Sequence, residues 1–231
     1  MARTASPSWR DFLPRFERGA MALFALTLAL SALVGDRPLG AMLRVQPGAL
    51  LSGAGLWQPL TANFVFPGDG VGLVIGTLFS QWLFGSDLER FWGTRRYVTL
   101  VLSAGTAGYL AYALVSPWLP ELEHGGSSGF DLAAIAAYGV VFAKRELSLF
   151  GAATFRGRTL AIILVLLGLI GPVMRGASWT TPIPWLISVG IALLVTTQPW
   201  RRRGDRDGTT RKPRGKAKPS HLKVVPKELL N

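Results

Sequence analysis

Six long apolar runs, nearly free of charged residues, constrain this chain more than any other feature of its sequence. Each run has about 17–20 residues, which is the length an α-helix needs to cross a bilayer. Hydrophobic residues make up 49% of the 231 residues, and the charged residues collect between the runs. This pattern indicates an integral membrane protein of the all-α class. The predicted spans are residues 19–35, 70–88, 97–116, 127–143, 158–174 and 179–197.

The first span follows Arg3, Arg10, Arg15 and Arg18, as the apolar part of a signal peptide follows its basic end. The segment before it is long, however, and no clear small-residue cleavage site follows Val34. These two features favour an uncleaved first helix. Several spans also contain Gly, Ser, Thr or Pro, which suit packed helix–helix contacts and therefore predict a compact bundle.

Basic residues predict the orientation of the bundle. Of the 25 Lys and Arg residues, 22 fall in the segments 1–18, 89–96, 144–158 and 200–231. The other three, Arg37, Arg44 and Arg175, lie in the loops of the opposite side. Loops rich in Lys and Arg stay in the cytoplasm. We therefore expect a multi-pass protein of the plasma (inner) membrane, with both termini cytoplasmic.

The chain divides into three predicted parts by composition. Residues 1–18 form a cytoplasmic segment, residues 19–199 a six-helix membrane domain, and residues 200–231 a basic cytoplasmic tail. The tail carries 11 basic residues and few apolar ones, which is typical of disorder. Each basic residue near an anionic lipid surface contributes about 1 kcal/mol of attraction. We expect the tail to bind anionic lipid and not nucleic acid, because no aromatic residues interleave with its charges.

Metal and cofactor chemistry has little support in the composition. The chain has no Cys, and His124 and His221 are its only histidines. Thiolate sites are therefore excluded, and a histidine-rich metal site is not expected. We predict no metal and no cofactor.

Four short motifs occur in a characteristic order between Leu56 and Gly151. They are Trp57-Gln58 with Leu60-Thr61-Ala62-Asn63-Phe64, then Trp82-Leu83-Phe84-Gly85 with Leu88-Glu89-Arg90 and Gly93, then Gly105 to Tyr112, and finally Gly126-Ser127-Ser128-Gly129. Together they resemble the signature of the rhomboid family of intramembrane serine proteases. The resemblance covers close to half of the chain and implies a six-helix rhomboid-like bundle with both termini inside.

The resemblance implies a nucleophile but no partner for it. Rhomboids have a G-x-S-G motif whose serine is the nucleophile, which here gives Gly126 and Ser128. The family's base is a histidine on the sixth helix, and this chain has none there. The His and Asn that the family's second helix adds to the oxyanion hole fall at Leu73 and Thr77, of which only Thr77 can donate a hydrogen bond. The family's upstream loop His falls near Pro67.

A serine hydroxyl is a weak nucleophile unless a neighbouring base takes its proton. Three other residues are candidates for this role beside Ser128. Lys144 is 16 residues further along the same helix, about 24 Å away, which excludes it. His124 precedes Ser128 by four residues, but Gly125 and Gly126 intervene and favour an ordinary loop histidine. Asp131, one turn into the helix, either orients Ser128 or stabilises the helix start as a first-turn acid.

The helix after Ser128 also has a clear structural interpretation. Ser is a good N-cap residue. Gly129, Ala133 and Ala137 recur every four residues, which lets a neighbouring helix approach closely. A small residue is therefore expected at this helix start whether or not the protein is an enzyme.

Three functions follow, of which the first is favoured. The first is a rhomboid-like pseudoprotease that binds the transmembrane segments of client proteins. The second is an active rhomboid-type intramembrane serine protease that uses Ser128 with an unconventional base. The third is a six-helix membrane protein of another class, such as a small transporter. Asp131 is the only clear ionisable residue well inside a span, which argues against transport.

Overall fold

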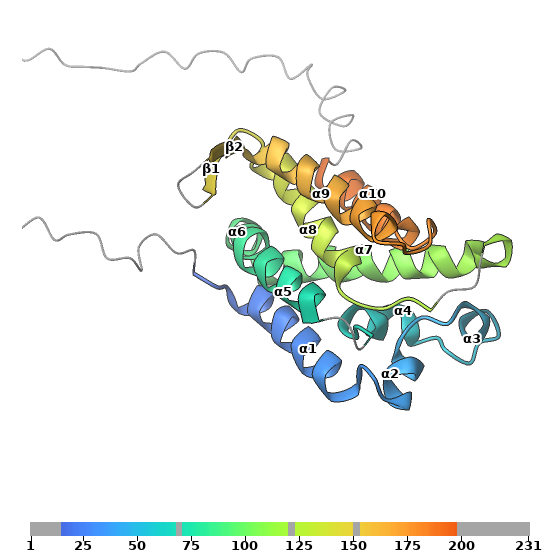
Figure 1. Ribbon diagram of the computed structural model, residues 1–231. Helices are drawn as coiled ribbons and strands as arrows, with labels where there is room; N and C mark the ends of the chain where they lie inside the picture. The colour runs from blue at the N-terminus through green and yellow to red at the C-terminus, as the bar shows by residue number, and fades with distance from the viewer. Residues whose placement is uncertain (1–14, 68–70, 120–122, 150–152, 198–231) are drawn as a thin grey trace, which may run out of the picture. The chain divides into compact units, whose positions relative to one another are not determined.

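Residues 15–67, 71–119, 123–149 and 153–197 are described by a computed structural model, shown in Figure 1. Most of the described residues are helical. The predicted basic tail and nearly all of the predicted N-terminal segment lie outside the described residues.

Helices occur at all six places where spans were predicted. They are α1 (Arg18–Val34), α5 (Val71–Phe79) with its continuation, α7 (Thr94–Val115), α8 (Ser128–Val141), α9 (Gly157–Met174) and α10 (Ile183–Thr197). By length and composition, two stretches of the described chain could each cross a membrane, Thr94–Trp118 and Gly157–Met174. The helices α1, α8 and α10 are apolar but shorter. The mostly helical class is thus confirmed, whereas the count of six spans stays a prediction.

The second predicted span differs from a plain α-helix. After α5 the chain forms a π-helical stretch, η3 (Ser80–Gly85), and then α6 (Ser86–Trp92). Gly93, with φ of 83°, ends this element and allows the chain to turn into α7. A π-helical turn holds an extra residue and re-aims side chains, and such turns are frequent at functional sites. Here it turns Ser80 and Gln81 into the interior.

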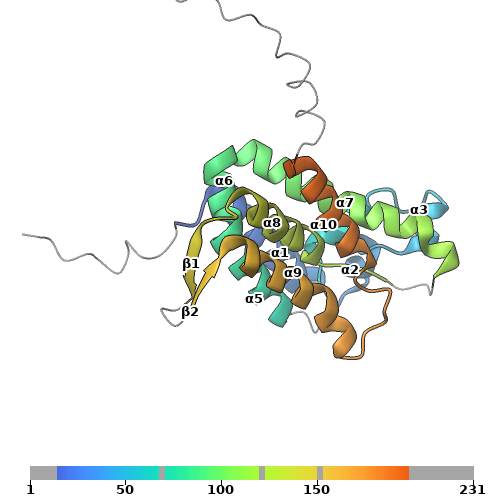
Figure 2. The same cartoon turned by 90° about the horizontal axis from the view of Figure 1, so that it is seen from above.

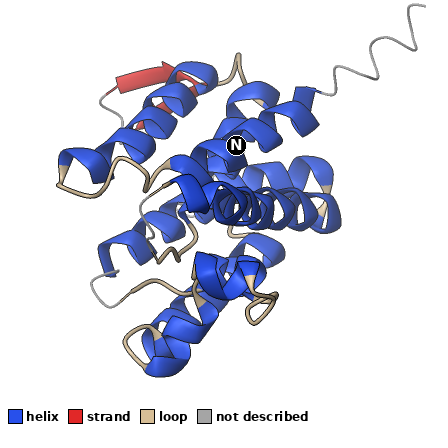
Figure 3. Ribbon diagram, turned by 90° about the vertical axis from the view of Figure 1, so that its right-hand side faces the viewer, coloured by secondary structure: helices blue, strands red, loops and turns tan. Residues whose placement is uncertain are grey.

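A two-stranded hairpin follows α8, so the all-α prediction was incomplete. Strands β1 (Glu146–Leu149) and β2 (Ala153–Arg156) are antiparallel, with Glu146 opposite Arg156; they are drawn in red in Figure 3. Polar and apolar residues alternate in β1, which is the pattern of a strand. The hairpin is linked to α6, because Arg145 donates to the Asp87 carboxylate over 2.6 Å.

The long loop after α1 folds into short helices. These are α2 (Pro38–Leu43), α3 (Pro47–Leu51), α4 (Gln58–Thr61) and the 3₁₀ turn η2 (Ala62–Phe64). Three of these helices have Pro at their first or second residue. Pro lacks a backbone N–H, and an N–H at this position would have no hydrogen-bond partner within the helix. Leu39, Met42, Leu56 and Trp57 are exposed. Exposed apolar side chains of this kind are typical of segments that lie in the membrane interface.

The helix α8 lies at the centre of the bundle and contacts α7, α9, α10 and η3 (Figures 1 and 2). The small residues predicted to allow close packing lie in these contacts. A Cβ on Gly129 would lie 3.1 Å from Ser188 Oγ of α10. Ala133 is fully buried and packs with Ala104 of α7 and Ala192 of α10. These close contacts with α7 and α10 fix the position of α8 and therefore of its first turn.

The start of α1 is held by a carboxylate from α6. Both oxygens of Glu89 accept backbone N–H groups, from Gly19 at 2.9 Å and from Ala20 at 2.8 Å. The Thr94 hydroxyl donates to the same carboxylate over 2.6 Å. An acid at a helix N-terminus satisfies N–H groups that have no partner within the helix.

Candidate functional site

Gly126 fixes the turn that leads into α8. Its φ is 102°, a conformation that residues with a side chain rarely adopt. Its N–H donates to Ala62 over 2.7 Å, and its carbonyl accepts from the Tyr109 hydroxyl over 2.7 Å. A Cβ at this position would lie 2.1 Å from the Phe66 ring. Only glycine fits here, and the fit determines where the next two serines lie.

Ser128 is the first residue of α8 and is half-buried at the wall of a pocket of about 390 Å³, named here the Ser128 pocket. Its walls come from the loop before α5, from α5, from the segment before α8, from the end of α9 and from α10. The lining residues are Phe66, Pro67, Leu73, Glu123, His124, Gly125, Ser128, Pro172, Arg175, Ala177, Ser178, Thr181 and Trp185.

The positions carried over from the rhomboid signature meet in this pocket. Pro67 and Leu73 line it together with Ser128. Neither has a side chain that can donate or accept a hydrogen bond. At these two positions the resemblance expects polar catalytic side chains, and the chain has apolar residues instead; Thr77, the third such position, does not line the pocket.

Trp185 is the residue of α10 that lines the Ser128 pocket, and it is 8% exposed. The resemblance places the family's base on this helix. An indole has one N–H donor and no acceptor, so it cannot take a proton from a serine hydroxyl. One turn further along, the Ser188 hydroxyl donates to the Pro184 carbonyl over 2.9 Å. Sequence reasoning noted that the helix lacks His but did not identify Trp185.

Asp131 does not stand free beside Ser128. Its Oδ2 accepts from the Ser127 hydroxyl over 2.7 Å, and its Oδ1 accepts from Gln81 Nε2 over 2.8 Å. It was predicted either to orient Ser128 or to serve as a first-turn acid. It is an acid in the first turn of α8, as the second alternative predicted, and its carboxylate is bonded to the neighbouring serine and to η3.

Thr77 belongs to the same buried cluster. It is 1% exposed, shares a hydrogen bond with Ser127 Oγ and also donates to the Leu73 carbonyl over 3.2 Å. Its predicted role was that of a weak oxyanion donor. In this geometry its hydroxyl is engaged with Ser127 and its own helix.

Tyr97 completes the cluster from α7. Its hydroxyl donates to Gln81 Oε1 and the residue is fully buried. The cluster, named here the Asp131 network, consists of Thr77, Gln81, Tyr97, Ser127 and Asp131. It joins α5, η3, α7 and α8 through polar groups that would each cost free energy if left unpaired. Sequence reasoning missed Gln81 and Tyr97, although a polar residue inside an apolar span is a signal that could have found them.

Ser127 also corrects the expected helix cap. The helix begins at Ser128, so Ser127 occupies the N-cap position. The Ser127 side chain makes no capping hydrogen bond to the backbone of α8, because its hydroxyl donates to the Asp131 carboxylate. The turn is held by Gly126 instead.

His124 lies close to Ser128 in sequence and lines the same pocket. Its backbone pairs with Val45 in both directions, over 2.8 and 3.1 Å. Its ring packs on Tyr112 with 4.2 Å between ring centroids, and the residue is 5% exposed. The contacts of this histidine are those of a packed loop residue that ties the segment before α8 to the first loop.

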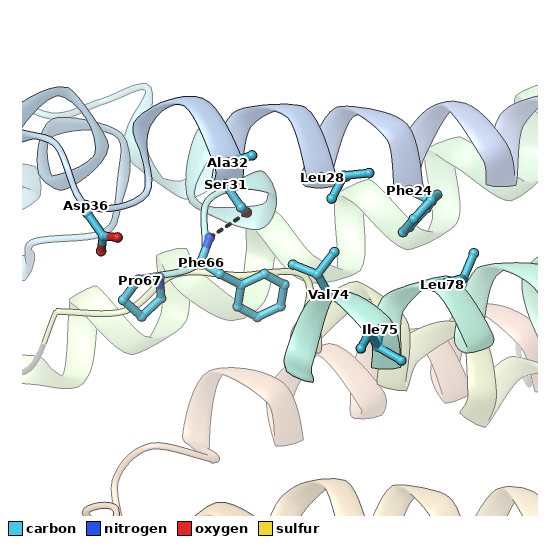
Figure 4. Close-up of a pocket in the computed structure, with 10 residues that line it drawn as sticks. All are labelled: Phe24, Leu28, Ser31, Ala32, Asp36, Phe66, Pro67, Val74, Ile75 and Leu78. Carbon is cyan, nitrogen blue, oxygen red and sulfur yellow. Dashed lines mark hydrogen bonds between the residues drawn. The ribbon is translucent and has the colours of Figure 1, made fainter. Parts of the chain in front are cut away.

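A second groove, of about 380 Å³, runs between α1 and α5 (Figure 4). Phe24 and Leu28 of α1 face Val74, Ile75 and Leu78 of α5 across it. At one end the Ser31 hydroxyl accepts from the Phe66 N–H over 3.0 Å. Apart from Ser31 and Asp36, the residues that line the groove are apolar. Within the described ranges, no group of three or more His, Asp or Glu side chains could hold a metal ion.

A family model for the rhomboid domain matches residues 54–195, which is more than half of the chain. The chain belongs to the rhomboid family. Rhomboids are integral membrane proteins, and Thr94–Trp118 and Gly157–Met174 are candidate spans of this one. A comparison with curated proteins gave no match. Family membership decides against the third function considered from sequence, a six-helix protein of another class.

The rhomboid domain covers the segment from just before α4 almost to the end of α10. It therefore contains Gly126, Ser128 and the whole Asp131 network. The match establishes the rhomboid architecture around the Ser128 pocket, and the side chains in that pocket decide what chemistry it can support.

Proposed function

We propose that this rhomboid is a pseudoprotease that binds the transmembrane segments of client membrane proteins. The observation that carries the proposal is Trp185 in the Ser128 pocket, on the helix from which a rhomboid supplies its base. A serine hydroxyl attacks a peptide bond only when a neighbouring group takes its proton. Trp185 cannot do so.

The other groups near Ser128 support the same conclusion. Both oxygens of Asp131 accept hydrogen bonds, from Ser127 and Gln81. The His124 ring packs on Tyr112. Pro67 and Leu73 offer no donor to a developing oxyanion, which active sites need for several kcal/mol of stabilisation. Among the described residues, no group stands as an evident base for Ser128.

The pocket remains suited to binding. It is lined by the apolar side chains of Phe66, Leu73 and Trp185 and by the hydroxyl groups of Ser128 and Thr181. A transmembrane segment presents apolar side chains, and its terminal turn presents backbone groups that lack helical partners. We propose that the end of a client helix enters the pocket, where the Thr181 hydroxyl hydrogen-bonds one of its free carbonyls.

Site-specific photocrosslinking in the native cell tests this proposal. A photoreactive residue at Leu73, which lines the pocket and is 41% exposed, should capture intact membrane proteins. The same group at Leu194, an exposed residue of α10 that does not line the pocket, should not capture them. The captured set should be unchanged in Ser128→Ala. Clients that are cut in the wild type and accumulate whole in Ser128→Ala would overturn the proposal.

The alternative is an active rhomboid-type serine endopeptidase that uses Ser128 with an unconventional base. Ser128 is accessible at the pocket wall, and His124 and Glu123 line the same pocket. The Glu123 carboxylate is paired with Arg44. The crosslinking experiment separates the two functions, because only the protease consumes its captured clients.

We further propose a multi-pass protein of the plasma membrane with both termini in the cytoplasm, on the distribution of the basic residues. The tail then lies against anionic lipid, and nucleic acid is not a partner. Removing residues 204–231 should weaken binding to anionic vesicles and should leave the thermal unfolding temperature in detergent unchanged. The difference in binding should shrink at high salt, since the attraction is screened. A large loss of thermal stability would contradict this role.

A further inference from the structure

An apolar groove of about 480 Å³ lies on the far part of α8 from Ser128, between α9 and α10. Ala136 and Gly139 of α8, with Ala143 just after the helix, form its floor. Val165 of α9 forms one wall and Leu193 of α10 the other. We call it the α9–α10 groove. Neither the proposed client binding nor the Ser128 pocket uses it.

Small floor residues explain why the groove exists. A Cβ on Gly139 would lie 2.5 Å from the Ala161 Cβ, so α8 and α9 touch here with no room for larger side chains. The main helix contact of α9 is with α8, and α10 packs on α7 and α8. The helices α9 and α10 therefore diverge above a floor of Ala and Gly. Ile162 and Leu166 are each 50% exposed along the rim, as expected of residues facing hydrocarbon.

One end of the groove is strongly basic. Arg158, in the first turn of α9, lines the groove itself. Lys144 follows the floor residue Ala143 directly, and Arg156 ends β2; both are exposed. Arg145 is already neutralised by Asp87. Within the described part of the chain, Arg158 takes part in no ion pair.

We propose that the α9–α10 groove binds one anionic phospholipid, with an acyl chain along the floor and the headgroup phosphate against Arg158. The groove and an anionic phospholipid are complementary in charge. An apolar trough that ends at a cation matches an amphiphile with an anionic head, and basic pockets between membrane helices bind such headgroups. The end of a client helix on the cytoplasmic side is usually basic and would be repelled by Arg158. This inference does not depend on whether the protein cuts or only binds its clients.

Lipid titration of the purified full-length protein in non-ionic detergent tests the site. Native mass spectrometry would count bound dioleoyl phosphatidylglycerol and, separately, dioleoyl phosphatidylcholine. Arg158→Gln should weaken phosphatidylglycerol binding about five-fold, which corresponds to the attraction of one basic residue near a lipid surface. Arg95→Gln is the matched control, because Arg95 is also an exposed Arg in the first turn of a helix but does not line the groove. It should bind as the wild type does.

A second variant tests the groove itself. Ala143→Leu fills the floor beside Arg158 and should weaken binding of the same lipid, while circular dichroism confirms that the protein remains folded. The full chain carries its basic tail in every sample, so the tail cannot produce a difference between variants. Equal phosphatidylglycerol binding by Arg158→Gln and Arg95→Gln would overturn the proposal. So would phosphatidylcholine binding as tight as that of phosphatidylglycerol, or full displacement of the lipid by millimolar inorganic phosphate, which would show a free-anion site.

Discussion

The Ser127 hydroxyl donates to Asp131 Oδ2 over 2.7 Å, and this bond ties up the acid nearest to the candidate nucleophile. The same carboxylate accepts from Gln81 on η3. Gln81 in turn accepts from Tyr97 on α7. With Thr77 of α5, the Asp131 network connects four helical elements, α5, η3, α7 and α8. Its role in this account is to hold the bundle together and not to activate Ser128.

Asp131→Ala should destabilise the protein by about 1–3 kcal/mol, because Gln81 Nε2 would be left buried without its acceptor. Asp131→Asn should cost less, since the amide oxygen can still accept from Gln81. Denaturant unfolding in detergent micelles, followed by circular dichroism, measures both. An Asp131→Ala protein as stable as the wild type would show that the network contributes nothing to the fold.

Gly126→Ala should be much more damaging than Gly176→Ala. Both glycines have positive φ, 102° and 91°, so both substitutions introduce backbone strain of about 1–2 kcal/mol. Only at Gly126 would the new Cβ also meet a side chain, the Phe66 ring at 2.1 Å, whereas Gly176 has nothing within 4 Å. The yield of folded protein and its thermal unfolding temperature should therefore fall sharply for Gly126→Ala. Equal effects at the two positions would mean that the Phe66 contact is not as tight as described.

Ala133→Leu should destabilise the bundle by about 1–3 kcal/mol through overpacking, since Ala133 is fully buried between α7 and α10. Ser128→Ala should change stability by no more than about 0.5 kcal/mol, because the residue lies at a pocket wall and is half-exposed. If the protein is a client-binding scaffold, activity in its native cell should fail with the first change and survive the second. A stable, correctly inserted Ser128→Ala protein with the phenotype of a deletion would favour the protease.

The topology prediction can be checked with reporter fusions. A reporter after Asn231 should behave as cytoplasmic, and one inserted near Glu121 as external, because 22 of the 25 basic residues fall on the side of the termini. An external C-terminus would contradict the count of six spans.

The helices could be placed from sequence because their apolar runs are long and bounded by charge. All six predicted positions hold a helix, and the rhomboid assignment is confirmed by the family match. The π-helical stretch at Ser80–Gly85 could not be predicted, since it depends on the polar contacts of Gln81 with Asp131 and Tyr97 and not on a local pattern. The hairpin after α8 was missed because its two strands are only four residues each.

The positions of the candidate site residues could be predicted from the sequence, but the side chains that they contact could not. The motif identified Gly126 and Ser128, and periodicity placed Asp131 one turn away. The turn at Gly126 decides which of the two serines Asp131 contacts. The φ of 102° at Gly126 cannot be inferred from residue spacing. Trp185 was not identified because a missing histidine is visible in the sequence, whereas the residue of α10 that lines the Ser128 pocket is visible only in the folded structure.

Trp185→His offers a gain-of-function prediction. The substitution places an imidazole on α10 in the Ser128 pocket, and a neutral imidazole can take the serine proton. We expect Trp185→His to react with a fluorophosphonate probe faster than the wild type. The added reactivity should vanish in the double variant with Ser128→Ala. Reaction should stay slow in absolute terms, because Leu73 and Pro67 still provide no oxyanion donor.

The most direct test of the central claim, that Ser128 is not an activated nucleophile, is fluorophosphonate labelling of the purified wild-type protein. Labelling would be quantified by intact-mass spectrometry and compared with that of Ser128→Ala. The account predicts no more labelling of the wild type than of Ser128→Ala over hours at neutral pH. Stoichiometric labelling that maps to Ser128 would contradict it and would establish an active serine enzyme with a base other than a residue of α10.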